Sequence, residues 1–319
     1  MSSKQEKNSE RKFRYVSLAG CKLLGKGAHG AVYRLNDDQI IKVYTDNSKL
    51  SEIDKERLCA QTAFFEGIPT CIAYDTVVTE EGIGVIFEMI KGSVLGSYMN
   101  EHQNEFDTLI DAYVGVLKLF HSTKADTSKY LSSKEVYIDI INRLPEKKFG
   151  KKHIQSLINV VNAAPDGDNY IHNDLHPQNI IRDDNGELMI IDMADVSYGH
   201  FIFDLGGLYT TLVFSASTSS KVCERVTGLT TKQAKHLWKE TLKKYFNTND
   251  EKFIRKIEKS CAILRDIYLL TLIVREGNVW SPLTLSVISI WVKFRLVFNE
   301  KACVRELSSF NDAIQQLNG

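Results

Sequence analysis

The sequence predicts an α+β protein with two lobes: a small antiparallel β N-terminal lobe with one helix, and a larger, mainly helical C-terminal lobe. A chain of 319 residues is too long for one small core. Residues 15–88 carry short β-type runs separated by turn signals, whereas apolar residues recur at helical spacing after Gly92. We therefore expect a disordered tail at 1–12, an N-terminal lobe at 13–90 and a C-terminal lobe at 91–319.

The elements of the N-terminal lobe follow from this pattern. Ser51 to Glu66 sets apolar residues among charges at helical spacing, and Ser48 or Ser51 suits the start of that helix. The predicted strands, each bounded by a turn signal, are Val16–Leu24, Ala31–Leu35, Gln39–Tyr44, Ile72–Thr79 and Gly84–Met89.

The C-terminal lobe has the periodicity of helices, interrupted by short β-type runs between Tyr170 and Asp192. Two later apolar segments, Ile267–Val274 and Pro282–Phe298, are predicted to be buried helices. The first is too short to span a bilayer, and basic residues interrupt the second. The helices predicted before the interruption are Phe106–His121, Lys134–Leu144 and Lys152–Ala163.

Composition narrows the class of protein. Lysine plus arginine equals aspartate plus glutamate, at 40 each, so no net charge points to nucleic acid or to an anionic membrane as a partner. The six cysteines are scattered and none forms a C-x-x-C pair, which favours reduced thiols in a cytoplasmic protein. Residues 1–12 lack the apolar core of a secretion signal. The sequence sets no oligomeric state.

Residues 25–32 form the pattern G-x-G-x-x-G-x-V, with Gly25, Gly27, Gly30 and Val32 at its fixed positions. Glycines let a turn bring backbone N–H groups close to phosphate oxygens, because no Cβ intervenes. A β-type run follows the loop, where a dinucleotide-binding βαβ unit would place a helix. The pattern therefore predicts a phosphate-binding β-hairpin.

Lys42 lies ten residues beyond Val32, among β-branched neighbours of a predicted strand. A lysine at this place can neutralise nucleotide phosphates, and it needs a carboxylate partner to hold it. Of the acidic residues on the following helix we favour Glu56, because it lies in mid-helix. Sequence alone leaves the other acidic residues of that helix open: Glu52, Asp54 and Glu66.

The segment from Ile171 to Ile181 carries Asp174 and Asn179 five residues apart, and a later apolar run ends at Asp192. Phosphoryl transfer needs one carboxylate to orient the attacking hydroxyl and accept its proton, and hard oxygen ligands for Mg²⁺. Asp174 suits the first role, and Asn179 with Asp192 suits the second.

Two residues near these are predicted to be structural. His172 sits in the same loop, where a histidine is more often hydrogen-bonded than catalytic. Asp204 has apolar neighbours, so we expect it to be buried and to brace the backbone of the loop.

Together these motifs resemble the protein-kinase-like superfamily, and more closely its aminoglycoside phosphotransferase and choline kinase branch, from about Leu23 to Leu208. The resemblance implies a two-lobed fold that uses ATP and Mg²⁺. It implies that Lys42 binds phosphates, that Asp174 is the catalytic base, and that the backbone of Glu88 and Ile90 reads adenine. In that scheme Glu56 anchors the lysine, and Asn179 and Asp192 bind the metal.

His176 decides between branches of the superfamily. Protein serine/threonine kinases usually have a lysine two residues after the catalytic aspartate, where this chain has His176. The D-F-G and A-P-E motifs are also missing. The resemblance thus implies phosphorylation of a small-molecule hydroxyl; a protein kinase and a nucleotide-binding regulatory pseudokinase remain the alternatives.

The acceptor is less well defined by the sequence. Residues 205–319 hold 17 lysines and arginines against 10 aspartates and glutamates. Because like charges repel, this surplus disfavours a polycationic aminoglycoside. A sugar, an amino alcohol, a hydroxy amino acid or another antibiotic-like compound remains open.

Overall fold

The computed structural model describes residues 13–27, 30–44, 50–274 and 282–318. The chain forms two compact units: residues 1–91 with 192–194 make up the N-terminal unit, and residues 92–191 with 195–319 make up the C-terminal unit. Residues 192–194, which fall within the predicted C-terminal lobe, thus belong to the N-terminal unit. The predicted tail at 1–12 and Ser48 lie outside the described residues.

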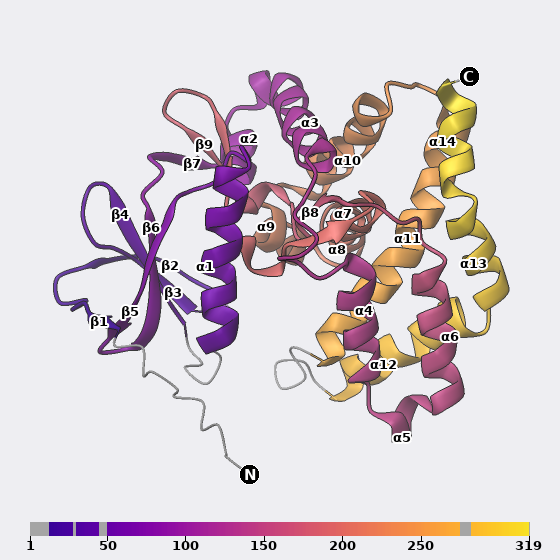
Figure 1. The fold of residues 1–319 in the computed structure, drawn as a ribbon. Helices are drawn as coiled ribbons and strands as arrows, with labels where there is room; N and C mark the ends of the chain where they lie inside the picture. Colours follow the sequence, from indigo (N-terminus) through magenta and orange to yellow (C-terminus); the bar gives the residue numbers. More distant parts are fainter. Residues whose placement is uncertain (1–12, 28–29, 45–49, 275–281, 319) are drawn as a thin grey trace, which may run out of the picture. The chain divides into compact units, whose positions relative to one another are not determined.

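The N-terminal unit consists of a six-stranded sheet and one long helix (Figure 1). The strand order is β1-β5-β6-β4-β3-β2. The elements are β1 (Arg14–Tyr15), β2 (Lys22–Lys26), β3 (Gly30–Arg34), β4 (Gln39–Tyr44), α1 (Leu50–Phe65), β5 (Ala73–Thr79) and β6 (Gly82–Glu88).

The sheet is mixed, so the prediction of an antiparallel sheet is wrong at one edge. Most neighbouring strands pair antiparallel, but β1 pairs parallel with β5, with Arg14 opposite Val77. The strand predicted at Val16–Leu24 is also replaced by the separate strands β1 and β2. No local pattern could show this pairing, because the partner of β1 lies far along the chain.

One face of β4 builds the core of the sheet. Ile41 and Val43 are buried there with Val77 and Ile86. Because successive side chains of a strand point to opposite faces, Lys42 and Tyr44 share the other face. Helix α1 packs against β5 and β6.

The C-terminal unit is mainly helical and contains two small sheets, ordered β10-β9-β7 and β11-β8. Its strands are β7 (Gly92–Val94), β8 (Asn169–Ile171), β9 (Ile180–Asp183), β10 (Leu188–Ile190) and β11 (Ser197–Gly199). Its α-helices are α2 (Leu95–Glu101), α3 (Phe106–Ser122), α4 (Ser133–Asn142), α5 (Glu146–Phe149), α6 (Lys151–Asn162), α7 (Ile202–Leu208), α8 (Ser215–Thr218), α9 (Ser220–Thr227), α10 (Thr231–Tyr245), α11 (Glu251–Val274), α12 (Pro282–Val292), α13 (Glu300–Ser308) and α14 (Phe310–Asn318). Two π-helical segments, η5 (Tyr209–Phe214) and η6 (Lys293–Val297), continue α7 and α12, and η3 (Pro177–Asn179) is a 3₁₀ turn.

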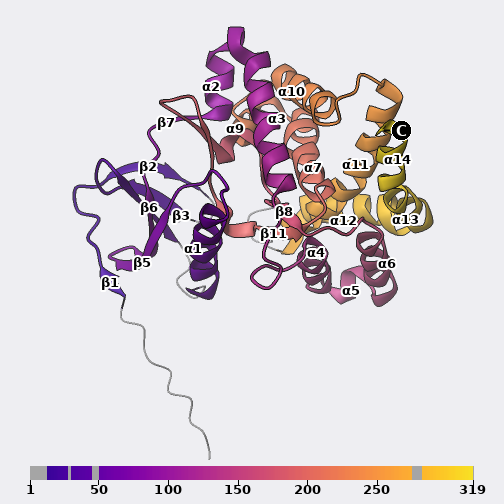
Figure 2. The same ribbon diagram turned by 45° about the horizontal axis from the view of Figure 1, so that its top comes forward.

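Helix α11 organises the packing of this unit, with contacts to α7, α12 and α13. Helices α4 and α6 lie side by side (Figures 1 and 2).

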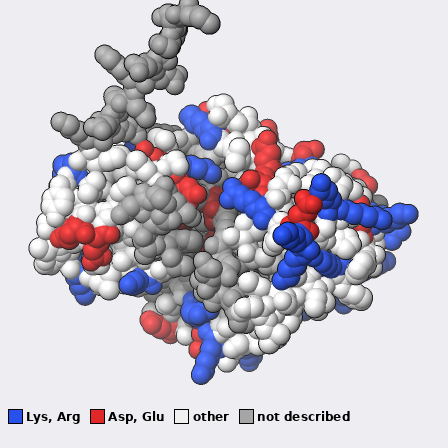
Figure 3. Space-filling view, turned by 90° about the horizontal axis from the view of Figure 1, so that it is seen from below, with Lys and Arg blue, Asp and Glu red and all other residues white. Residues whose placement is uncertain are grey.

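On the side of the molecule where Figure 1 places α5 and α6, the view from below shows lysine and arginine side chains gathered together (Figure 3). Helices α5 and α6 carry Lys147, Lys148, Lys151 and Lys152.

The segment predicted as a buried helix at Pro282–Phe298 is helical, but the prediction of burial is wrong for one of its sides. Val292 and Leu296 are buried, whereas Leu283, Ile290 and Phe294 are at least 65% exposed. The segment is apolar on nearly every side, so its periodicity could not mark an outer face.

Among the described residues, no single helix has the length and hydropathy to cross a membrane. One bent pair, Pro282–Val297 with Glu300–Ser308, passes on length and composition together.

Candidate active site

In the N-terminal unit, Lys42 lies between two carboxylates. Its Nζ is 2.7 Å from Glu56 Oε1 and 3.0 Å from Asp192 Oδ1. Burial alone would lower the pKa of Lys42, but these carboxylates outweigh it and raise the pKa above its ordinary value. The lysine is therefore held as a cation, as a group that neutralises phosphates must be.

Glu56 is the acidic residue of α1 that the structure places at Lys42. Its side chain is 4% exposed, and its second oxygen, Oε2, accepts a hydrogen bond of 2.7 Å from the Tyr44 hydroxyl. Sequence reasoning missed Tyr44. The signal was available, because Tyr44 is two residues from Lys42 and so must share its face of β4.

We expect Glu56→Ala to destabilise the N-terminal unit by about 3–5 kcal/mol, because it leaves the Lys42 ammonium and the Tyr44 hydroxyl without their shared partner. Hydrogen exchange of the α1 and β4 amides measures this free energy. The matched control is Asp37→Ala, whose exposed carboxylate pairs with Arg34 on the surface; it should change the free energy by less than about 1 kcal/mol. Equal losses in the two variants would contradict a special role for Glu56.

The predicted phosphate loop is the turn between β2 and β3. Gly27 N–H donates to Gly30 O, and a Cβ placed on Gly25 or Gly27 would meet no atom within 4 Å. Gly30 is different: a Cβ there would lie 2.0 Å from Val43 O, so this glycine is needed for the close approach of β3 to β4. Residues 28–29 of the motif lie outside the described residues.

Val32, the last residue of the loop motif, pairs with Lys42 across β3 and β4. At the end of β6, the Glu88 carboxylate accepts a hydrogen bond from Ile72 N–H, and Glu88 N–H donates to Ile72 O. The side chain of Glu88 therefore stabilises the backbone next to the sheet. Within the described residues, Ile90 N–H donates to no backbone carbonyl. That the backbone of Glu88 and Ile90 reads adenine stays a prediction.

In the C-terminal unit, the loop between β8 and β9 carries Asp174. Its backbone is fixed by Asp204, whose carboxylate accepts hydrogen bonds from His172 N–H at 2.9 Å and Asn173 N–H at 2.6 Å. His121 Nε2 lies 3.0 Å from the same carboxylate. Asp204 is buried, and the prediction that it braces the loop is confirmed. His172 is also buried, and its Nε2 lies 3.1 Å from Ile191 O, as expected of a hydrogen-bonded structural residue.

Asn173 holds the turn of the loop in a left-handed conformation, with φ of 66°. Its Nδ2 donates to Asp195 O at 2.7 Å and to Ser197 Oγ at 2.8 Å. Asparagine tolerates this conformation better than most residues. On the far side of the loop, the Tyr113 hydroxyl donates to Leu175 O. Sequence reasoning missed these supports, because their partners lie on other elements.

Asp174 keeps a 35% exposed side chain in this fixed loop. Asn179 Nδ2 donates to Asp174 Oδ2 at 3.1 Å and to its backbone O at 2.8 Å. Burial raises the pKa of Asp174, but the neighbouring His176 ring and the hydrogen bond from Asn179 lower it below its ordinary value overall. The carboxylate is thus ionised at neutral pH and can accept a proton.

His176, the residue that favoured the small-molecule branch, contacts the same carboxylate. Its Nε2 lies 3.5 Å from Asp174 Oδ2, and its Nδ1 accepts a hydrogen bond from Gln178 N–H. Because Nδ1 is the acceptor, Nε2 carries the proton and faces Asp174. This arrangement orients Asp174 and stabilises its charge.

The residues predicted to bind Mg²⁺ have suitable donor atoms. Asn179 uses its Nδ2 on Asp174, and its carbonyl oxygen Oδ1 is the kind of ligand that Mg²⁺ prefers. Asp192 has φ of 63° and belongs to the N-terminal unit, where Lys42 fixes its carboxylate. No group of three or more His, Cys, Asp or Glu suited to a metal occurs in the described part of the chain. Magnesium held largely by nucleotide phosphates does not require one.

A family model described as "Phosphotransferase enzyme family" matches residues 20–222, which is more than half of the chain. The chain belongs to the phosphotransferase enzyme family. The matched range contains the glycine loop, Lys42, the Asp174 loop and Asp204. The resemblance stated from the motifs is confirmed.

Solved structures agree on the fold of this family member. An ADP-bound aminoglycoside phosphotransferase, APH(2'')-Ib, matches with a TM-score of 0.59 at 15% identity, over 91% of this chain and 93% of that chain. The choline kinase LicA from Streptococcus pneumoniae matches with a TM-score of 0.52 at 17% identity, over 89% and 91%. A thermostable mutant of APH(4)-Ia, bound to ADP and hygromycin B, gives 0.54 at 14% identity, over 90% and 94%.

These likenesses confirm the two-lobed kinase-like fold of the phosphotransferase. No curated protein matches the chain. The roles given to Lys42, Glu56, Asp174, Asn179 and Asp192 stay predictions.

Proposed function

We propose that the protein transfers the γ-phosphoryl group of ATP to a hydroxyl of a small molecule, with Mg²⁺ as its metal cofactor. The observation that carries the proposal is Asp174: an ionised, partly exposed carboxylate on a loop that Asp204 and Asn173 hold rigid. Catalysis of phosphoryl transfer depends mainly on positioning and on charge. The residues of this chain can supply both the positioning and the charge.

Each residue has a defined part in this reaction. The oxygen of the acceptor hydroxyl forms a bond to the γ-phosphorus, and Asp174 accepts the proton of that hydroxyl. The bond from the γ-phosphorus to the oxygen that bridges it to the β-phosphorus breaks, and ADP leaves. Lys42, held by Glu56, neutralises the α- and β-phosphates. Asn179 and Asp192 would hold Mg²⁺, and the metal would offset the negative charge of the phosphate oxygens.

A screen of hydroxyl compounds tests the proposal. We expect a phosphate ester, detected by ³¹P NMR, to form from ATP with at least one sugar, amino alcohol, hydroxy amino acid or antibiotic. Lys42→Met should reduce its formation by about 10–100-fold, the loss typical of a charged hydrogen bond. Hydrolysis of ATP to ADP and phosphate, with no ester from any compound, would contradict the proposal.

The cytoplasmic location stays a prediction from the sequence.

A further inference from the structure

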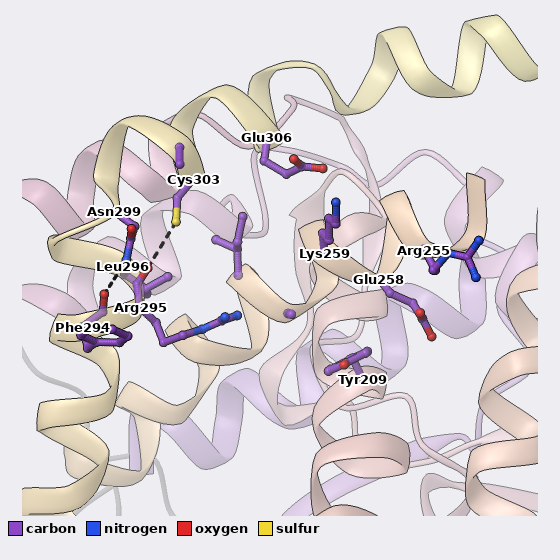
Figure 4. Close-up of a pocket in the computed structure, with 13 residues that line it drawn as sticks. Tyr209, Arg255, Glu258, Lys259, Phe294, Arg295, Leu296, Asn299, Cys303 and Glu306 are labelled. Atoms are coloured by element: carbon purple, nitrogen blue, oxygen red, sulfur yellow. Dashed lines mark hydrogen bonds between the residues drawn. The ribbon is translucent and has the colours of Figure 1, made fainter. Parts of the chain in front are cut away.

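A pocket of about 580 Å³ lies in the C-terminal unit, between η5, α11 and the segment from η6 to α13 (Figure 4). None of the residues of the Asp174 loop lines it. The pocket is open to solvent on one side, and its volume is enough for a small organic molecule. The charged side chains that line it are those of Arg255, Glu258, Lys259, Arg295 and Glu306.

The Arg295 side chain is held in place by a hydrogen bond to a buried carboxylate. Its Nε donates to Asp266 Oδ2 at 3.1 Å, and Asp266 is fully buried. The other oxygen, Asp266 Oδ1, accepts hydrogen bonds from Trp291 Nε1 at 2.9 Å and from Arg265 Nη2 at 2.6 Å. The Arg295 guanidinium also lies over the Trp291 ring, 5.7 Å from its centre.

This cluster has an excess of positive charge. Two guanidinium groups share the single Asp266 carboxylate, and the Arg265 side chain is only 9% exposed. Arg265 gains some compensation from the rings of Tyr209 and Phe214, at 5.5 and 5.2 Å. The positive charge is nearly buried at Arg265 and reaches solvent at Arg295, where a counter-charge can approach it.

Arg295 is where such a counter-charge can bind. Its side chain is 40% exposed, and within the described residues neither Nη atom donates a hydrogen bond. Figure 4 shows its guanidinium extending into the pocket from the η6 side. The planar pair of donors matches a carboxylate or phosphate group.

The two carboxylates that line the pocket differ in their hydrogen-bond partners. Glu258 accepts a hydrogen bond from Trp238 Nε1 at 2.9 Å. Glu306 Oε1 is buried and has no hydrogen-bond partner in the described part of the chain. An unpartnered buried acceptor is costly, and a donor on a ligand would satisfy it.

We infer that this pocket binds a small molecule with a carboxylate or phosphate for Arg295 and a hydroxyl or ammonium donor for Glu306. Lys259, on the exposed side of α11, adds a second positive charge at the rim. Binding of such a molecule is inferred independently of the proposed function. Only the suggestion that the bound molecule is an acceptor for phosphoryl transfer rests on that function.

Isothermal titration with matched probes tests the inference: glycerol, glycerate, glycerol 3-phosphate and serine. The wild-type protein should bind the three charged probes at least tenfold more tightly than glycerol. Arg295→Gln should lose at least tenfold in affinity for the charged probes, and Lys259→Gln severalfold. Arg305→Gln is the control, because Arg305 is exposed on α13 and does not line the pocket.

Equal affinity for glycerol and the charged probes would overturn the inference, as would equal losses in Arg295→Gln and Arg305→Gln. Lys259 has no part in the Asp266 cluster, so a loss of affinity in Lys259→Gln cannot be explained by misfolding of that cluster. Each probe is then incubated with ATP. Phosphorylation of a bound probe identifies an acceptor, and binding without phosphorylation identifies a ligand of another kind; both results support the site.

Discussion

Asp174→Asn is expected to lower kcat/KM for phosphoryl transfer by about 10²–10⁴-fold, the usual contribution of a general base, while the Kd for ATP changes by less than about threefold. The asparagine keeps the size of the side chain and removes its capacity to accept the proton. Steady-state kinetics with an acceptor found by the screen give kcat/KM, and equilibrium titration gives the Kd.

The matched control is Asp183→Asn, in the hairpin between β9 and β10. Asp183 Oδ1 accepts hydrogen bonds from Asn185 N–H and Glu187 N–H, so it shapes a turn. This variant should keep most of the activity. An Asp174→Asn enzyme as active as the wild type would remove Asp174 from the reaction.

The pH profile adds a second readout for Asp174. Its pKa is lowered, so the ionised form persists as pH falls, and activity should be lost only below the ordinary range of an aspartate. His176→Gln removes a main cause of the lowered pKa. The acid limb of kcat/KM should therefore move to higher pH in that variant, and an unmoved limb would contradict the role of His176.

Asp204→Ala is expected to reduce the free energy of unfolding of the C-terminal unit by about 3–5 kcal/mol. The change leaves the buried N–H groups of His172 and Asn173, and the ring of His121, without their acceptor. Urea unfolding followed by tryptophan fluorescence measures the loss, because all three tryptophans of the chain lie within residues 195–319.

Two further variants sharpen this test. Asp204→Asn keeps the shape but turns an amide toward backbone donors, so it should rescue little of the loss. Asp312→Ala, on the exposed side of α14, should change the free energy by less than about 0.5 kcal/mol. A loss below about 1 kcal/mol in Asp204→Ala would show that the loop does not depend on this carboxylate.

The parts of the site that depend on short spacing could be predicted from the sequence. Asp174 and Asn179 are five residues apart, and their hydrogen bond follows from one tight loop. The role of Asp204 was also predictable, because a carboxylate among apolar neighbours must find buried donors. The parallel pairing of β1 and the cluster around Asp266 were not, because each joins segments whose contacts no local pattern encodes.

Helix periodicity had a similar limit. It located α3, α4 and α6 to within two residues, because these helices have distinct apolar and polar sides. It failed on the outer side of α12, where Leu283 and Ile290 are exposed although they are as apolar as the buried Val292.

The hydrogen bond from Tyr44 to Glu56 has a consequence for regulation. In a kinase that is switched by moving its helix, the lysine–glutamate pair separates in the resting state. Here the glutamate is also tied to β4, and burial and the charge of Glu56 raise the pKa of Tyr44 above its ordinary value, so the phenol stays protonated and keeps donating. Withdrawal of α1 would break both bonds at once. We expect an enzyme that is constitutively competent, with its output set by the supply of acceptor.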